Sequence, residues 1–287
     1  MRIRLLKKKP VTSGPRPDDT HPAESLPDGP SSISSRPAAS HPSGSHPAGT
    51  HPGMNAAAVQ NELRKHADAD QARHLMRFFK TGPGEYGEGD RFLGIRVPEQ
   101  RKISRKYRQL PLDEVRILVR SPYHEERLTG LLILTYRFPK AAEHEQMKIF
   151  KFYIMHTPFI NNWDLVDVTA PKIVGTWLEM RSRKLLYELA GSESVWERRI
   201  AMLSTLHFIR NDDLKDTLQL AEILLKDTHD LIHKAVGWML REAGKKDLQK
   251  LEAFLDRHAG NMPRTMLRYA IERLPETRRR YYMRLTA

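Results

Sequence analysis

The sequence contains no cysteine. Its 287 residues therefore cannot form a disulfide, a thiolate nucleophile, a zinc site with cysteine ligands or a cysteine-bound iron–sulfur cluster. Long apolar runs are missing too, since stretches such as GLLIL, residues 130–134, are far shorter than the roughly 20 residues of a transmembrane helix. The basic start MRIRLLKKK lacks the apolar stretch of about seven residues that a secretory signal needs. We therefore expect a soluble, cytoplasmic protein with no membrane partner.

The first 53 residues hold ten of the 19 prolines and five of the 16 glycines, with His-Pro steps at residues 21, 41, 46 and 51. A segment of this composition cannot bury enough apolar surface to offset the entropy of ordering it. The sequence therefore predicts a disordered Pro/His/Ser-rich tail over residues 1–53 and a folded domain over residues 54–287. Because helical periodicity begins directly after Met54, that methionine is a candidate for the true start.

Positive charge exceeds negative charge along the chain. Lys and Arg number 48 against 35 Asp and Glu in the whole sequence, and 41 against 31 in residues 54–287. Basic residues gather at 101–108 and again at 264–284. Clusters of this size attract polyanions such as nucleic acids, but a solvated helix face gives the same pattern. Charge alone leaves both interpretations open.

From residue 55 onward, apolar residues recur every three or four positions, as in Leu214, Leu218 and Leu225. This spacing is the period of an amphipathic helix, and no segment alternates with the period of two that a strand shows. Glycine, proline and polar breaks divide the chain into about a dozen helices. Pro122 and Pro263 are expected in first turns, where a missing N–H costs little.

Helices this short cannot each bury an apolar face alone, so they must stack in antiparallel pairs. Pairs of roughly 35 to 45 residues predict an all-α fold, namely a HEAT-like helical-repeat solenoid of about six antiparallel helix pairs. Its concave face is expected to carry positive charge and to fit duplex DNA. No repeated sequence signature is visible, so a globular helical bundle stays open as the alternative.

The segment INNWDLVD, residues 160–167, is the strongest candidate for chemistry. If it is helical, Trp163 and Asp167 lie on one face, one turn apart, where a carboxylate and an indole can border the same cleft. A carboxylate beside aromatic faces suits a cationic substrate. A second tryptophan, Trp238, follows in KAVGWMLRE, residues 234–242. Taken without other motifs, either indole would more often belong to the core.

Four segments give the sequence a resemblance to a known family. They are FLGIRVPEQRK (92–102), NNWDLVD (161–167), VWERRIAML (195–203) and KAVGWMLRE (234–242). In this order and at these separations, they resemble the AlkD branch of the AlkC/AlkD family of HEAT-repeat DNA glycosylases. The resemblance runs from about residue 55 to the C-terminus.

The resemblance implies that Asp167 is the catalytic carboxylate and that Trp163 and Trp238 contact the lesion-bearing nucleotide. It also implies that Arg199 supports the site, where a guanidinium can both keep Asp167 ionised and bind a phosphate. Phe78 stands where relatives carry a tyrosine near the DNA, so one polar contact is expected to be weaker. The candidates for DNA binding are Arg199, its neighbour Arg198 as the alternative, Arg241, Trp196, Phe78 and Lys234.

The implied activity is that of a monofunctional glycosylase of the DNA-3-methyladenine/7-methylguanine type. It hydrolyses the N-glycosidic bond of cationic N3- or N7-alkylated purines in double-stranded DNA and leaves an abasic site. Such a base leaves without a general acid, and a carboxylate can stabilise the oxocarbenium-like sugar and orient water. No metal or cofactor is expected, and the protein is expected to be a nucleoid-associated monomer. The alternative is a HEAT-repeat module that binds damaged or branched DNA without chemistry.

Two other patterns have plainer interpretations. His229 and His233 stand four residues apart, as in a zinc-protease helix, but Asp230 replaces the glutamate and no third ligand is evident. The glycine-rich segment 82–90 lacks the strand–turn–helix setting of a phosphate-binding loop. We expect it to be a flexible connection.

Overall fold

The computed structural model describes residues 54–285, so the tail predicted over residues 1–53 lies outside the described residues. Within the described range the fold is all-α, as predicted, and the single β-type pairing there is an isolated bridge between Arg91 and Tyr123. Between residues 54 and 285, no helix combines the length and the apolar character needed to cross a membrane.

The helices follow one another closely along the chain. In order they are α1 (Ala56–Arg64), α2 (Ala69–Phe78), α3 (Val97–Lys106), α4 (Leu112–Val119), α5 (His124–Arg137), α6 (Glu143–Met155), α7 (Trp163–Ala170), α8 (Thr176–Leu178), α9 (Lys184–Ala190), α10 (Val195–Arg210), α11 (Lys215–Ile223), α12 (Asp230–Lys246), α13 (Leu248–His258), α14 (Arg264–Ile271) and α15 (Glu276–Leu285). A π-helical turn, η3 (Pro171–Gly175), joins α7 to α8.

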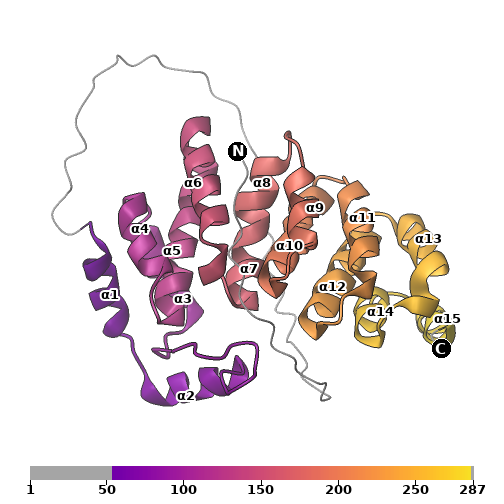
Figure 1. The fold of residues 1–287 in the computed structure, drawn as a ribbon, viewed down its shortest axis with the longest axis horizontal. Helices are drawn as coiled ribbons and strands as arrows, with labels where there is room; N and C mark the ends of the chain where they lie inside the picture. Colours follow the sequence, from indigo (N-terminus) through magenta and orange to yellow (C-terminus); the bar gives the residue numbers. More distant parts are fainter. Residues whose placement is uncertain (1–53, 286–287) are drawn as a thin grey trace. The chain divides into compact units, whose positions relative to one another are not determined.

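The helices form two layers that stack along an arc (Figure 1). In the inner layer, α3, α5, α7, α10, α12 and α14 contact one another in that order. The outer layer covers them, with α4 against α5, α6 against η3, α9 against α10, and α11 and α13 against α12. Consecutive helices thus pair and the pairs repeat, which confirms the predicted helical-repeat fold.

The N-terminal turns of the inner helices lie side by side at one edge of the array. His124, the first residue of α5, bonds Asp164 in the first turn of α7. Asp167 of α7 bonds Arg199 of α10, which in turn donates to the carbonyl of Leu231 at the start of α12. Because helix N-termini carry partial positive charge, that edge favours negatively charged groups.

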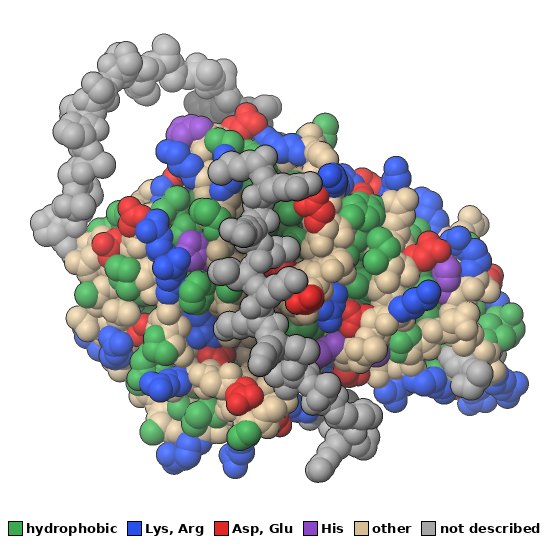
Figure 2. All heavy atoms as spheres, viewed as in Figure 1, with side chains coloured by type: hydrophobic (Ala, Val, Ile, Leu, Met, Phe, Trp, Pro, Cys, Tyr) green, Lys and Arg blue, Asp and Glu red, His purple; other side chains and the backbone are tan. Residues whose placement is uncertain are grey.

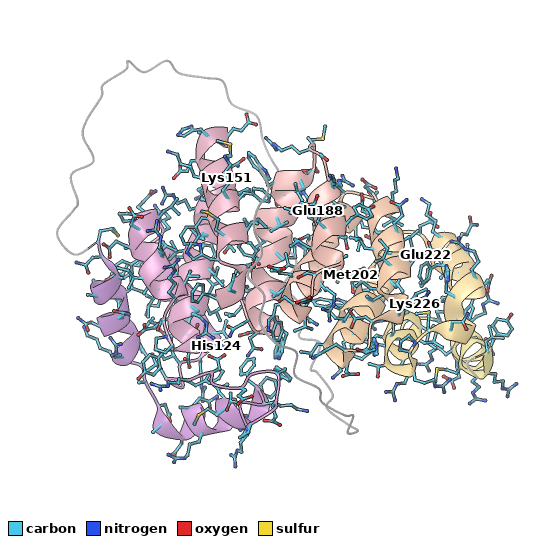
Figure 3. All side chains as sticks on the ribbon, viewed as in Figure 1. His124, Lys151, Glu188, Met202, Glu222 and Lys226 are labelled. Atoms are coloured by element: carbon cyan, nitrogen blue, oxygen red, sulfur yellow. The ribbon has the colours of Figure 1, made fainter. Side chains whose placement is uncertain are left out.

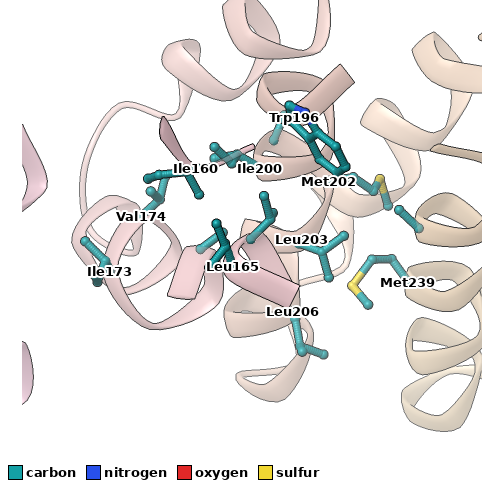
Figure 4. Packing of buried hydrophobic residues seen from close by; sticks show 14 of the residues in the cluster. Ile160, Leu165, Ile173, Val174, Trp196, Ile200, Met202, Leu203, Leu206 and Met239 are labelled. Atoms are coloured by element: carbon teal, nitrogen blue, oxygen red, sulfur yellow. The ribbon is translucent and has the colours of Figure 1, made fainter. Parts of the chain in front are cut away.

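The hydrophobic core lies between the layers and continues from one repeat to the next (Figure 4). Leu165 of α7, Ile173 of η3, Ile200 and Leu203 of α10 and Met239 of α12 are fully buried. Each such side chain contributes about 1.5–3 kcal/mol through removal from water. The core therefore fixes the spacing of α7, α10 and α12, which carry the candidate functional residues.

Pro171 widens the helix that begins with α7. Proline lacks an N–H, and its ring clashes with the carbonyl four residues earlier, which here belongs to Asp167. The chain continues as the π turn η3, a feature that is frequent at functional sites. At its end Gly175 lies so close to α10 that a Cβ there would be 2.4 Å from the carbonyl oxygen of Ser204. Glycine at this position therefore permits the close approach of the two segments.

Two helix starts differ from the sequence prediction by one or two residues. Pro263 is the residue directly before α14, and Pro122 lies two residues before α5, so neither stands in a first turn. At α5 the hydroxyl of Ser121 accepts a bond from the N–H of Tyr123 at 3.0 Å, and Tyr123 stays extended. This local bond delays the helix until His124.

Gly175→Ala is expected to lower the free energy of unfolding by about 1–3 kcal/mol, because the new methyl group must push η3 away from α10. Gly191→Ala is the matched control, since the nearest atom to its Cβ would lie 3.7 Å away. That variant should stay within about 0.5 kcal/mol of the wild type. Urea unfolding followed by circular dichroism measures both changes, and equal stability of the two variants would contradict the close contact.

Candidate active site

The start of α7 is fixed by Asn162. This residue is fully buried, and its Oδ1 accepts a hydrogen bond from the N–H of Trp163 at 2.8 Å. Asp164 follows in the first turn, where its negative charge suits the positive end of the helix. One turn after Trp163 comes Asp167, so the two side chains share a face of α7, as the sequence predicts.

Asp167 and Arg199 form a bidentate ion pair between α7 and α10. The Nε and Nη2 atoms of Arg199 donate to Oδ1 and Oδ2 of Asp167 at 2.8 and 2.7 Å. The side chain of Arg199 is 3% exposed and that of Asp167 is 13% exposed, so it is the carboxylate that reaches solvent. Burial raises the pKa of Asp167 above its usual value, while the charge of Arg199 opposes that shift. Each carboxylate oxygen has two acceptor positions, so room for a water remains.

Each of the three nitrogens of the Arg199 guanidinium donates a hydrogen bond to a protein group. Besides the two bonds to Asp167, its Nη1 donates to the carbonyl oxygen of Leu231 at 2.5 Å. A buried guanidinium with these partners fixes the plane and the charge of the carboxylate. We also expected Arg199 to bind a phosphate, but in the structure its donors point at Asp167 and at α12.

Aromatic side chains surround Trp163. Its ring stacks on Phe79 with centroids 5.1 Å apart, and Phe78 meets it edge-on at 5.9 Å. Its Nε1 donates to the hydroxyl oxygen of Tyr86 at 3.3 Å, and the ring of Tyr86 meets Trp196 edge-on at 6.2 Å. The structure thus gathers three predicted site residues, Phe78, Trp163 and Trp196, around one tyrosine that the sequence analysis did not single out.

Tyr86 belongs to the glycine-rich segment 82–90, which we expected to be a flexible connection. The segment is instead tied back to the residues that follow α2, because the N–H of Gly87 donates to the carbonyl of Lys80 at 3.0 Å. Its last residue, Asp90, is buried. The repeated glycines were a usable signal, since they permit a tight turn that brings Tyr86 back toward α2.

A buried group of charges lies behind the aromatic residues. Nδ1 of His124 is 2.8 Å from Asp90 and Nε2 is 2.7 Å from Asp164, while Arg127 donates to Asp90 at 2.5 Å. Burial disfavours the charged imidazolium, but the two carboxylates outweigh that effect and raise the pKa of His124 to about 9. The ring is therefore a cation at neutral pH. His124 is labelled in Figure 3, and Phe92 stacks on it at 4.6 Å, a favourable cation–π arrangement.

The remaining basic candidates are engaged with acidic neighbours. These pairs are Arg198 with Asp227, Lys234 with Asp230, and Arg241 with Glu272. Arg241 is only 7% exposed and joins α12 to the end of α14. These three side chains therefore hold repeats together or stabilise a single helix. None of the three ion pairs involves Asp167.

Trp238 lies on α12, the inner helix next to α10. It stands one turn after Lys234 and two turns after Leu231, whose carbonyl binds Arg199. Trp238 therefore lies about 10 Å along the helix axis from Leu231. Trp238 is partly buried against the core, so one side of its indole packs while the rest is accessible.

His229 and His233 form hydrogen bonds with the backbone at the start of α12. The N–H of Leu231 donates to Nδ1 of His229 at 3.1 Å, and Nε2 of His233 lies 2.5 Å from the carbonyl of Asp227. In residues 54–285 no three His, Asp or Glu side chains converge as metal ligands do. The pair resembling a zinc-protease motif is thus a helix cap and a backbone contact.

Comparison with known proteins points to one family. A family model for DNA alkylation repair enzyme matches residues 59–274. Among solved structures, a similar chain is a predicted DNA alkylation repair enzyme from Enterococcus faecalis, with 17% identity and a TM-score of 0.58. That match covers 74% of this chain and 98% of the other, and at this identity it speaks for the fold alone. No curated protein matches the sequence.

The charged state of His124 is expected to make stability depend on pH. Its pKa rises from the ordinary 6.5 to about 9 in the folded protein, so the contribution is complete below about 6.5 and is lost as pH rises through 9. The loss amounts to about 3 kcal/mol. Urea unfolding near pH 6 and near pH 10 should show this loss in the wild type and in the exposed control His144→Gln, but not in His124→Gln. The same pH slope in all three proteins would refute the assignment.

Proposed function

The chain belongs to the DNA alkylation repair enzyme family, and on that premise we propose that it is a monofunctional DNA glycosylase for cationic alkylated purines. It hydrolyses the N-glycosidic bond of N3- or N7-alkylated purines in duplex DNA and leaves an abasic site. The proposal rests chiefly on the ion pair of Asp167 and Arg199, in which the carboxylate keeps 13% exposure one helical turn from Trp163.

A purine alkylated at N3 or N7 already carries a positive charge, so it leaves with the bonding electrons and needs no proton from the enzyme. Positive charge then develops on the sugar. Asp167 stabilises that charge and accepts a hydrogen bond from the water that attacks the anomeric carbon. Arg199 favours the ionised carboxylate in spite of its burial, and its two parallel bonds hold the carboxylate plane in one orientation.

The indoles supply selectivity for a charged base. Trp163 is stacked on Phe79, which holds the orientation of its indole, and we assign this indole to the first contact with the base. A cation over an indole face gains on the order of 0.5 to 2 kcal/mol, depending on how much water is removed. We assign Trp238, on the neighbouring α12, to the second such contact, since α12 is tied to Asp167 through Arg199.

Positive charge at the C-terminal end supports a DNA partner. Residues 264–284 contain seven arginines against two glutamates. Arg264 and Arg268 lie one turn apart on α14, Arg280 and Arg284 lie one turn apart on α15, and all four are exposed. Figure 2 shows basic side chains gathered along this end of the molecule. Contacts of such arginines with phosphates would weaken steeply as salt rises.

The alternative is a module that binds damaged or branched DNA without chemistry, for which the arginine-rich end alone would suffice. A binder of phosphates gains nothing from a partly exposed carboxylate, because that charge repels the DNA backbone. The placement of Asp167 therefore favours the enzyme.

Asp167→Asn is expected to slow release of 7-methylguanine from methylated duplex DNA by at least about 100-fold, because an amide does not stabilise the cationic sugar. Affinity for the same DNA should stay nearly unchanged. Chromatography of the free base and fluorescence anisotropy of labelled DNA measure the two quantities. Asp113→Asn, at an 82% exposed position on α4, is the matched control and should keep full activity.

Undiminished base release by Asp167→Asn would reject the role of this carboxylate. A wild-type protein that binds DNA in a salt-dependent way but releases no base would instead support the non-catalytic alternative.

Trp163→Leu and Trp238→Leu are expected to slow release of cationic 3-methyladenine by about 3- to 30-fold, in line with the loss of one cation–π contact. Release of a neutral base such as hypoxanthine should change less. Trp177→Leu is the control, since Trp177 lies on α8 against Phe150 and Arg181, away from Asp167. Equal slowing on charged and neutral bases would argue against the cation–π contact.

A further inference from the structure

We propose that Tyr86 is a positioning residue for Trp163 and that the loop carrying it, residues 82–90, is part of the active site. The inference rests on the proposed function, because it concerns how the indole that receives a cationic base is held. Tyr86 precedes Trp163 by 77 residues, and it reaches the site from the connection between α2 and α3.

The hydroxyl of Tyr86 stands between partners from different repeats. It accepts the indole N–H of Trp163 at 3.3 Å and lies 3.4 Å from the carbonyl of Phe78, to which it can donate. A phenol both donates and accepts, so one hydroxyl serves both contacts. Its ring also meets Trp196 of α10 at an interplanar angle of 72°. Tyr86 therefore links the tryptophans of α7 and α10.

These contacts decide which part of Trp163 faces a ligand. An indole carries partial negative charge on its faces and partial positive charge at its edge, where the N–H lies. Tyr86 takes the N–H, and Phe79 covers one face at an interplanar angle of 28°. In this orientation the N–H edge is turned to Tyr86 and away from a ligand, so the part of the ring that Trp163 offers to a base is a face, which attracts a cation. Without the bond to Tyr86, the ring could turn its N–H edge toward the base, which would repel a positive charge.

The loop is built to hold Tyr86 at one place. A Cβ at Gly87 would lie 2.3 Å from the carbonyl oxygen of Phe79, so the chain after Tyr86 packs directly on the end of α2. Three residues further, Asp90 binds His124 and Arg127 with both of its carboxylate oxygens. The loop is therefore fixed on both sides of the turn that contains Tyr86.

The same histidine also holds the start of α7. Nδ1 of His124 faces Asp90 at the end of the loop, and Nε2 faces Asp164, the residue next to Trp163. One imidazolium ring thus sets the position of the loop relative to α7. Tyr86 and Trp163 are brought together by this shared anchor as well as by their own hydrogen bond.

Tyr86→Phe removes the hydroxyl and keeps the ring. Single-turnover release of 3-methyladenine from alkylated duplex DNA is expected to slow by about two- to tenfold, the range for loss of one hydrogen bond. In a Trp163→Leu background the same substitution should have no further effect, because the two residues act as one unit. Tyr136→Phe, at a half-buried tyrosine of α5 near Arg105, is the matched control and should behave like the wild type.

A second measurement reads the bond directly. The indole N–H signal of Trp163 in a proton–nitrogen NMR spectrum should shift in Tyr86→Phe and stay in place in Tyr136→Phe. Unchanged base release together with an unmoved signal would overturn the inference, as would a full additional loss in the Trp163→Leu background. If the wild type releases no base from alkylated DNA, the proposed function fails, while the NMR signal still decides whether Tyr86 holds Trp163.

Discussion

The ion pair of Asp167 and Arg199 ties three repeats together at the edge where the inner helices begin. It joins α7 to α10, and the bond from Arg199 to the carbonyl of Leu231 extends the tie to α12. Two buried charges carry a desolvation cost of several kcal/mol per ion, and their mutual attraction offsets this cost only if the geometry is good. Here three hydrogen bonds satisfy one guanidinium, and the carboxylate alone keeps contact with solvent.

The site is layered from the interior outward. Deepest are Asp90, Arg127 and His124 with Asp164, a set in which two acidic charges balance two basic ones. Aromatic rings cover this set and lead to Trp163. The interior is therefore close to electrically neutral, and attraction for a phosphate backbone comes from the periphery, where arginines are exposed and helix N-termini collect. A nearly neutral interior with one partly exposed carboxylate, surrounded by positive charge, suits the proposed cationic base within a polyanion.

Sequence periodicity was enough to predict the helices, since both the three- to four-residue spacing and the one-turn separation of Trp163 from Asp167 are local, but it left a globular bundle open beside the helical repeat. The partner of Asp167 is not local. Arg198 and Arg199 are adjacent, yet a rotation of about 100° per residue sends one to Asp227 and the other to Asp167, and spacing cannot choose between them. Only the family resemblance favoured Arg199.

The glycines around Tyr86 indicate a turn, but they do not indicate which residues Tyr86 contacts. Its segment has neither helix nor strand period, and its place follows from the buried contact of Asp90 with His124. That contact joins residues 34 positions apart in the chain, and no periodicity in the sequence relates the two positions.

The π turn at Pro171 makes the position of Asp167 depend on the number of residues that follow it in this helix. A π turn holds one residue more than the α-helix it replaces, so α7 and α8 are rotated relative to each other by roughly 100° compared with a continuous helix. Deletion of a single residue from η3 would convert α7, η3 and α8 into one continuous α-helix. Such a helix could still pack between its neighbouring repeats. The deletion would also swing Asp167 out of line with α10. Among homologous chains, the number of residues between this carboxylate and Gly175 should therefore separate those that can keep the acid in place from those that retain only the scaffold.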